Sequence, residues 1–522
     1  MNNPGKFLKI FFYEIINRGI YFKVFKIKFF YDNAFSYHWN FSLLKFKSTY
    51  FIFISITLLV ILLTYLFKDV RFDDPYITFQ YAKNLSEGKG FVFNEGEKVL
   101  GTTTPLYTLI LAFLGFYFIN FPSLSIILSA ISLLFLSYCI YFIVSNDGKK
   151  IWAFLCVILI LFNSQTCSCF GMETIFYSML IYGAFLTYFK KYFYLTTVLL
   201  ALAILTRGDS ILLVFLISSA YLYENRRFPY KYAGLFLIIT LPWLMFSLWY
   251  FGVIFPNTLS AKYGATQSMM DTFFMILKNK LIYFFNPIFG IIKPFYFLFI
   301  AFGLFYILKK RIKLIIIPIW ILAHILGYSM LRVSPTGFDW YYFPVLPGLV
   351  IISIFGVKYF FEWVSVRFSK FRIAKAIMSL FLIIVCCFSV INSLRYLYEF
   401  HLSFPKDKYF GARDDVYREI GIWIKRNTNQ NSTIASPEVG TIGYYGERKM
   451  IDLFAIVTPQ MLPHRYDWEW AIKNLKPDYF IYRKENWNVS PDFLYSNPFY
   501  SLLKKFNNNE FEEVLIFKRN KL

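Results

Sequence analysis

The sequence predicts a polytopic α-helical membrane protein with a small α/β domain at its C-terminal end. Of 522 residues, 57% are hydrophobic and 22% aromatic. Only 16% are charged, against about 25% in an average soluble domain. Eleven apolar runs have about the 20 residues that a membrane span needs, and after residue 396 the composition changes to a soluble pattern. These observations divide the chain into a basic segment (1–47), a membrane domain (48–396) and a soluble domain (397–522).

The candidate spans set the topology through the positive-inside rule. They lie near residues 48–67, 123–145, 151–169, 172–189, 192–206, 209–223, 230–250, 281–308, 314–331, 343–361 and 376–396. Residues 105–120 are apolar but short for a span. If residues 105–120 form an interfacial or re-entrant helix, the basic connectors between spans all fall in the cytoplasm. If these residues are counted as a span, the first basic connector falls outside the cell and the sides of the later connectors are reversed. We therefore predict a multi-pass cell-membrane protein with a cytoplasmic N-terminus and an extracytoplasmic C-terminal domain.

The formal charge of +23 belongs to the membrane part. Residues 397–522 carry 18 Lys and Arg against 16 Asp and Glu, so almost all the excess lies in the first 396 residues. Cytoplasmic loops beside anionic lipid account for this distribution, and we expect no nucleic-acid partner. Residues 1–47 interleave Lys and Arg with aromatic residues, which is typical of a basic amphipathic segment on the cytoplasmic leaflet and not of a cleavable signal peptide. A misassigned start codon is an alternative explanation of this segment.

The soluble domain is expected to contain one amphipathic helix and several short strands. Residues 414–425 have helical spacing of apolar side chains, and residues 432–435, 449–453, 477–482 and 512–517 have strand patterns. Gly440, Gly443 and Gly446 are expected to form turns between strands.

Two adjacent carboxylates, Asp73 and Asp74, follow the first span directly. Such a pair can act as a general base, clamp a metal or simply form a solvated turn. The same predicted face carries the cations Arg207, Lys262 and Arg332, which can bind a phosphate or serve only as interfacial charges. An enzyme that uses one lipid-linked and one polar substrate needs such charged residues together on one face of the membrane domain. A lipid-linked saccharide transporter or flippase is the alternative, although transporters usually place ionisable residues at mid-membrane in broken helices.

Residues 72–108, FDDPYITFQYAKNLSEGKGFVFNEGEKVLGTTTPLYT, resemble the first extracytoplasmic loop of the GT-C glycosyltransferases that use lipid-linked sugars. The resemblance is strongest to the group that includes the mycobacterial terminal arabinofuranosyltransferase. Shorter matches to the same family follow in chain order, at 171–174 (GMET), 205–209 (LTRGD), 256–258 (PNT), 261–262 (AK), 337–340 (GFDW), 437–440 (PEVG) and 451–453 (IDL).

The resemblance implies an inverting glycosyltransferase with a GT-C-type membrane domain. Its donor would be a polyprenyl-phosphate-linked sugar, and its acceptor an envelope glycan, glycolipid or glycoprotein at the outer face of the bilayer. Asp73 would be the base, with Asp74 as alternative or helper, and Glu173 would give acid or metal support. The implied substrate-binding residues are Arg207, Asp209, Lys262, Tyr263, Arg332, Asp339, Trp340 and Glu438.

Metal use differs within the GT-C family, so the resemblance leaves a divalent cation open, with Asp73 and Glu173 as the expected ligands. Gln80 stands where the family usually has Arg, Gly208 where it has Pro, and Leu100 with Thr102 where it has Glu and Tyr. These departures leave the sugar undetermined.

Overall fold

The computed structural model describes residues 48–69, 72–145, 150–263, 268–278, 293–333, 339–367, 411–465, 467–483, 490–507 and 513–520, with isolated helical positions at 380, 391, 395 and 398. The chain divides into two units, Met1–Leu59 and Val60–Leu522. The first unit contributes only the start of helix α2 (Ser48–Phe67) to the described residues. Every other described element belongs to the second unit. The expected segment 1–47 lies outside the described residues.

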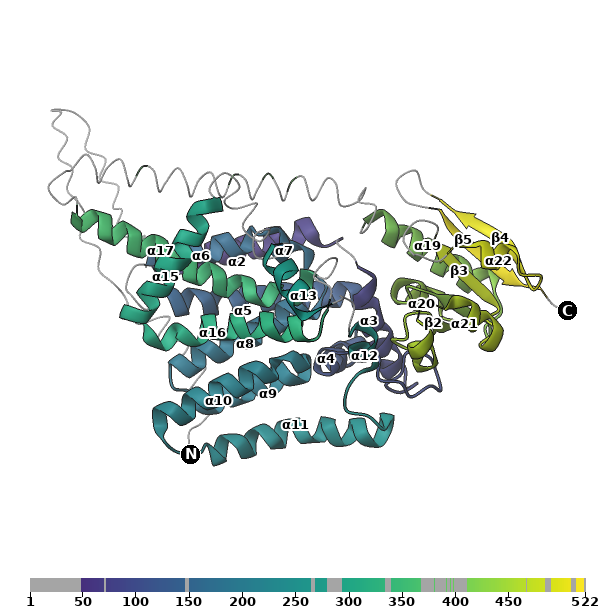
Figure 1. Cartoon of the computed structure of the whole chain (residues 1–522), viewed down its shortest axis with the longest axis horizontal. Coiled ribbons are helices and arrows are strands. Elements are labelled where there is room, and N and C mark those ends of the chain that lie inside the picture. The colour runs from purple at the N-terminus through teal and green to yellow at the C-terminus, as the bar shows by residue number, and fades with distance from the viewer. Residues whose placement is uncertain are drawn as a thin grey trace, which may run out of the picture. The chain divides into compact units, whose positions relative to one another are not determined.

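The membrane part is helical, as predicted (Figure 1). Five of its described helical segments are long and apolar enough to cross a membrane: Thr49–Phe67, Phe121–Ser145, Tyr230–Phe251, Ile312–Met330 and Phe343–Val364. The other helices are α6 (Lys150–Leu161), α7 (Ser164–Ser168), α8 (Glu173–Phe189), α9 (Phe193–Thr206), α10 (Ile211–Asn225), α12 (Asn257–Lys262), α13 (Met269–Ile276) and α15 (Lys293–Lys310). The predicted number of eleven spans is not confirmed, because several expected spans correspond to helices of 12 to 17 residues and the run at 376–396 lies almost wholly outside the described residues.

The first loop forms two short helices, α3 (Asp73–Ser86) and α4 (Pro105–Gly115), which pack against each other. Helix α3 begins with Asp73, Asp74 and Pro75. Acidic residues in the first turn complement the helix dipole, and proline is tolerated there because its missing N–H has no helical partner. Helix α4, with 11 residues, is only about 17 Å long and therefore too short to cross about 30 Å of hydrocarbon. Its placement at the interface stays a prediction.

The C-terminal domain is a five-stranded mixed sheet with helices on both faces (Figure 1). Strand order is β2-β1-β3-β5-β4, where β1 (Thr433–Ser436) pairs in parallel with β2 (Lys449–Asp452) and β3 (Tyr479–Arg483). The strands β5 (Val514–Arg519) and β4 (Tyr500–Phe506) extend the sheet in antiparallel fashion. Because successive side chains of a strand point to opposite faces, the sheet has two cores. One packs against α19 (Gly411–Asn427) and α20 (Gly440–Gly446), the other against α21 (Trp468–Asn474) and α22 (Asp492–Tyr495).

The first of these cores is shared with the first loop. Tyr81, Phe91 and Phe93 of the loop are buried in one cluster with Ile420 of α19 and Ile442 of α20. A fully buried phenylalanine contributes about 1.5–3 kcal/mol. The loop is therefore held against the soluble domain by hydrophobic packing as well as by polar contacts at the start of α3.

One expectation for the soluble domain was wrong, and one strand was not predicted. The glycines at 440, 443 and 446 lie in helix α20 and not in turns. A Cβ on Gly440 would contact the carbonyl oxygen of Asp73, and one on Gly443 would lie 3.0 Å from the ring of Phe93, so these glycines allow α20 to approach the first loop closely. Strand β4 was not predicted because only Tyr500 in it is buried, the rest being exposed or half-buried.

Candidate active site

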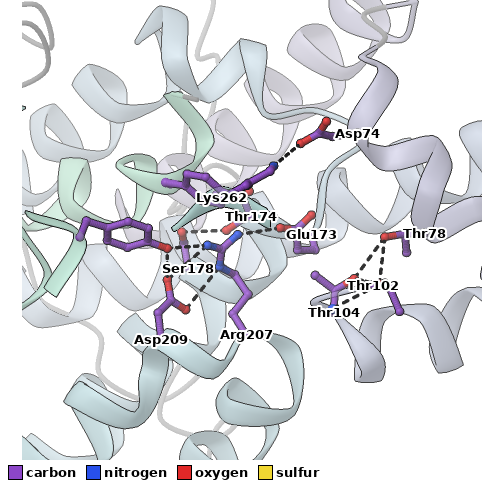
Figure 2. Close-up of polar contacts among 12 residues, drawn as sticks. Asp74, Thr78, Thr102, Thr104, Glu173, Thr174, Ser178, Arg207, Asp209 and Lys262 are labelled. Atoms are coloured by element: carbon purple, nitrogen blue, oxygen red, sulfur yellow. Dashed lines mark hydrogen bonds and ion pairs between the residues drawn. The ribbon is translucent and has the colours of Figure 1, made fainter. Parts of the chain in front are cut away.

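Asp74 and Lys262 form an ion pair at the mouth of a small cavity. The Nζ atom of Lys262 lies 3.1 Å from Oδ2 of Asp74 and 3.1 Å from the hydroxyl of Tyr341. The side chain of Asp74 is 35% exposed and that of Lys262 17% exposed. Burial alone would lower the pKa of Lys262, but Asp74 and Tyr341 outweigh it and raise that pKa. A protonated lysine is therefore fixed beside a solvent-accessible carboxylate (Figure 2).

Arg207 is the centre of a second charged group in the same cavity wall (Figure 2). Its guanidinium is 2.8 Å from Oε1 of Glu173 and 3.2 Å from Oδ2 of Asp209. It also donates to the hydroxyl of Tyr328 at 2.7 Å, and that hydroxyl donates to Asp209 at 2.6 Å. The ring of Tyr341 covers the guanidinium at 4.9 Å. The planar fork of donors in arginine suits this bidentate arrangement, which a lysine could not reproduce.

The positions of these residues follow from helix ends. Glu173 is the first residue of α8, Arg207 directly follows α9, and Asp209 lies in the 3₁₀ turn Gly208–Ser210 before α10. Lys262 is the last residue of α12, and Tyr341 ends the 3₁₀ helix Asp339–Tyr341. Polar side chains can cluster there because the chain leaves its apolar helices at these points.

The cavity between the two groups has a volume of about 50 Å³. Asp74, Glu173, Arg207, Lys262 and Trp340 line it. A buried water needs about 10–15 Å³ of such space, so this volume holds a few waters and no sugar. A substrate bound here requires the cavity to widen.

Asp73 points elsewhere. It is 6% exposed, and its carboxylate accepts hydrogen bonds from the backbone N–H groups of Gly440 at 3.1 Å and Thr441 at 2.7 Å. Burial, followed by the nearby charge of Glu438, raises the pKa of Asp73 to about 6, although the N–H of Thr441 and the charge of Arg413 oppose the shift. Asp73 thus joins the start of α3 to the start of α20.

The C-terminal domain also holds the helix that carries Lys262. The side-chain amide of Asn257 donates to the carbonyl of Ala455 at 3.1 Å, and Arg465 donates to the carbonyls of Ser260 and Ala261 at the end of α12. From the other side, Thr258 donates to the carbonyl of Gly101 at 2.5 Å. Both partners of the Asp74–Lys262 pair are therefore positioned by contacts with the soluble domain.

The remaining predicted residues are distributed over three places. Trp340 lines the cavity and its ring lies 6.1 Å from that of Phe72. Arg332 stacks on Tyr263 at 5.3 Å, and neither lines this cavity. Glu438 contacts Arg413, Tyr417 and Arg483 within the soluble domain. The side chain of Asp339 lies outside the described residues.

The residues suggested as metal ligands are not brought together. Asp73 accepts from backbone N–H groups, whereas Glu173 pairs with Arg207. Within the described part of the chain, no group of three or more His, Cys, Asp or Glu residues could hold a metal ion. The donors present therefore do not fit a divalent cation.

Sequence reasoning missed Tyr328, Tyr341 and a cluster of buried threonines. The hydroxyls of Thr78, Thr102 and Thr104 lie 3.2–3.4 Å apart beside the cavity (Figure 2). Tyr341 follows the recognised residue Trp340, so proximity in sequence could have indicated it. Tyr328 lies in the apolar run of α16 (Ile316–Met330), and the chain has 41 tyrosines, so nothing singles it out.

Comparison with known proteins supports the fold. The crystal structure of ArnT from Cupriavidus metallidurans bound to undecaprenyl phosphate matches with a TM-score of 0.60 and 14% identity, covering 90% of this chain and 98% of that one. The apo structure of the same protein matches with a TM-score of 0.58, 14% identity and the same coverage. A family model described as "Domain of unknown function (DUF8728)" matches residues 408–517. A search of curated proteins gives no match.

These likenesses support the GT-C fold but not membership of the arabinofuranosyltransferase group that the motifs resemble. The chain therefore has a GT-C-type fold, a polytopic helical membrane domain followed by a C-terminal α/β domain.

Proposed function

We propose that the protein is a glycosyltransferase that moves a sugar from a polyprenyl-phosphate carrier to an acceptor at the outer face of the membrane. The observation that carries this proposal is the convergence of Asp74, Lys262, Arg207 and Glu173 on one cavity. The GT-C fold supports it, as does the crystal structure of ArnT with undecaprenyl phosphate bound to that protein.

In the proposed reaction, the acceptor hydroxyl attacks the anomeric carbon of the sugar and loses its proton to Asp74. The new C–O bond forms as the bond from the anomeric carbon to the phosphate oxygen breaks, and the polyprenyl phosphate leaves with the bonding electrons. A single displacement of this kind inverts the anomeric centre. Lys262 is placed to stabilise the negative charge that grows on the departing phosphate.

We assign the base to Asp74 and not to Asp73, which the family pattern suggested first. A base must lie within hydrogen-bond reach of the proton that it removes, and only Asp74 of the two lines the cavity. Asp73 is instead proposed as the residue that fixes the first turn of α3 through Gly440 and Thr441.

Arg207 has a different proposed role from Lys262. Its donors are already engaged by Glu173, Asp209 and Tyr328. A phosphate at Arg207 would have to compete with two carboxylates, whereas Lys262 faces one. We therefore propose Lys262 as the first contact of the donor phosphate and Arg207 with Glu173 as the rigid wall behind it.

The test is sugar transfer by purified protein in lipid vesicles, with Asp74→Asn and Asp74→Glu as a matched pair. Asp74→Asn should lose about 100-fold or more in kcat, because general-base catalysis contributes about 10²–10⁴-fold, and Asp74→Glu should recover part of it. Transfer retained by a folded Asp74→Asn variant would contradict the assignment. A flippase would move the lipid-linked sugar without transfer in either variant.

A further inference from the structure

A second and larger cavity lies on another side of the first turn of α3. It has a volume of about 330 Å³, within the range of about 300–1,000 Å³ that is typical of ligand pockets. We call it the lateral cavity. Its walls are Phe72, Tyr76 and Phe79 of the first loop, the start of α5 (Phe121–Ser145), and Arg418 with Tyr445 of the soluble domain.

The lateral cavity and the candidate active site lie on different faces of one helix. Asp74 and Ile77 line the active-site cavity, whereas Tyr76 and Phe79 line the lateral one. Successive helical residues are about 100° apart, so these two pairs face away from each other by more than a right angle. Pro75 borders both cavities. Pro75 is therefore the wall residue that lies between a molecule in the lateral cavity and the active-site cavity, which Asp74 lines.

The lateral cavity is lined by apolar, aromatic and cationic residues. Ile127, on the candidate span α5, is 53% exposed and belongs to a surface suited to lipid. Lys68 and Arg418 also line the cavity and are exposed, and Asp69, a third lining residue, carries one opposing charge. Among the described residues, neither cation forms an ion pair: Lys68 lies over Tyr65 and Arg418 over Tyr445. A lining that combines apolar, aromatic and cationic side chains suits an amphiphile with a negatively charged head.

We propose that the lateral cavity binds the polar head of the acceptor, and that this acceptor is an anionic lipid-linked saccharide. The inference rests on the proposed transferase function and narrows its acceptor from glycan, glycolipid or glycoprotein to an amphiphile. The lipid chain lies along Ile127, the anionic group lies between Lys68 and Arg418, and the reacting hydroxyl reaches Asp74 past Pro75.

The first experiment measures lipid binding to the purified full-length chain by native mass spectrometry. The probes are phosphatidylglycerol as an anionic amphiphile, a neutral glucosyl diacylglycerol, and undecaprenyl phosphate. Ser123→Trp places a large ring in the lateral cavity from an exposed position. Arg418→Gln removes one cation, and Arg426→Gln is its matched control, because Arg426 is an exposed arginine of the same helix that does not line the cavity.

We expect Ser123→Trp to weaken phosphatidylglycerol binding about tenfold, equivalent to about 1.4 kcal/mol. Arg418→Gln should weaken it to a smaller extent, and Arg426→Gln should leave it unchanged. Wild type should bind the neutral lipid more weakly than the anionic one. Equal binding of phosphatidylglycerol by wild type, Ser123→Trp and Arg418→Gln overturns the proposal, and so does equal binding of the neutral and anionic probes.

Undecaprenyl phosphate separates this inference from the proposed function. Its binding should be weakened more by Lys262→Gln than by Ser123→Trp. If Lys262→Gln has no effect, the donor site fails while the lateral cavity result stands by itself. If undecaprenyl phosphate binds as expected and Ser123→Trp transfers sugar to a lipid extract at the wild-type rate, the lateral cavity is not the acceptor site and the proposed function is untouched.

Discussion

The carboxylate of Asp73 accepts a hydrogen bond of 2.7 Å from the backbone N–H of Thr441, which lies 368 positions later in the chain. The bond connects the first residue of α3 with the start of α20. Since Asp74 is the next residue, the soluble domain fixes the backbone from which Asp74 projects. The two aspartates are thus adjacent in sequence but have different surroundings. Asp73 is buried and accepts hydrogen bonds from backbone N–H groups, whereas Asp74 lines a cavity beside Lys262.

Asp73→Asn and Asp74→Asn should therefore have different effects. Asp73→Asn keeps an amide oxygen that can accept from Thr441, so transfer should stay within about tenfold of wild type, a change of about 1.4 kcal/mol. Asp74→Asn should lower kcat about 100-fold or more, while the protein stays folded in detergent. The reverse pattern, an active Asp74→Asn and an inactive but folded Asp73→Asn, would return the base to Asp73.

Asp73→Ala serves as the structural control for this pair. Alanine leaves the N–H groups of Gly440 and Thr441 buried without their acceptor, and each such group costs about 1–3 kcal/mol. We expect a lower melting temperature for Asp73→Ala than for Asp73→Asn. Equal melting temperatures would show that the hydrogen bonds from Gly440 and Thr441 to Asp73 contribute little to stability.

The pH dependence of stability provides a second test of the environment of Asp73. Its pKa is raised from 3.8 to about 6, so between these values the folded protein holds a proton that the unfolded chain has released. Stability contributed by this group is fully present below about pH 4 and is lost as the pH rises through about 6. The melting temperature of wild type should therefore fall relative to that of Asp73→Asn as the pH is raised from 4 to 7. Parallel curves for the two proteins would contradict the raised pKa.

The sequence was sufficient for the helical membrane class, and it named most of the charged residues that the structure brings together around one small cavity. Asp74, Glu173, Arg207, Asp209, Lys262 and Trp340 come together from five separate motifs, because each motif lies at a helix end and polar residues at helix ends of a membrane protein converge on its surface. The amphipathic helix at 414–425 was also predictable, and it is the central part of α19.

What failed depends on contacts distant in sequence. The environment of Asp73 is determined by Thr441, and no local pattern reports a hydrogen bond between segments 368 residues apart. The glycines of α20 resembled turn residues because local propensity cannot show that their missing side chains admit Asp73 and Phe93. Glu438 was named from a family motif and Arg332 from its predicted outer face, and the structure places the side chains of Tyr263, Arg332 and Glu438 outside the lining of the active-site cavity.

Tyr328→Phe should weaken the group around Arg207. The hydroxyl of Tyr328 accepts from Arg207 and donates to Asp209, and hydrogen bonds to charged groups contribute about 1.5–3 kcal/mol. We expect a lower melting temperature and a reduced kcat, with little change in KM for the acceptor. Tyr306→Phe is the control, since that hydroxyl accepts from Lys358 away from the cavity and its loss should change stability without a specific loss of kcat. Equal kcat values for the two variants would remove Tyr328 from the site.

Arg465→Gln should impair donor binding although Arg465 does not line the cavity. Arg465 binds the carbonyls of Ser260 and Ala261, so its loss frees the end of α12 and lets Lys262 move away from Asp74. We expect weaker binding of undecaprenyl phosphate, and no further loss when Arg465→Gln is combined with Lys262→Gln, since residues that act through one another are non-additive. Lys473→Gln, on the surface of the same domain, should leave binding unchanged. Additive losses in the double variant would show that Arg465 acts independently of Lys262, and the soluble domain would then not be what positions the phosphate contact.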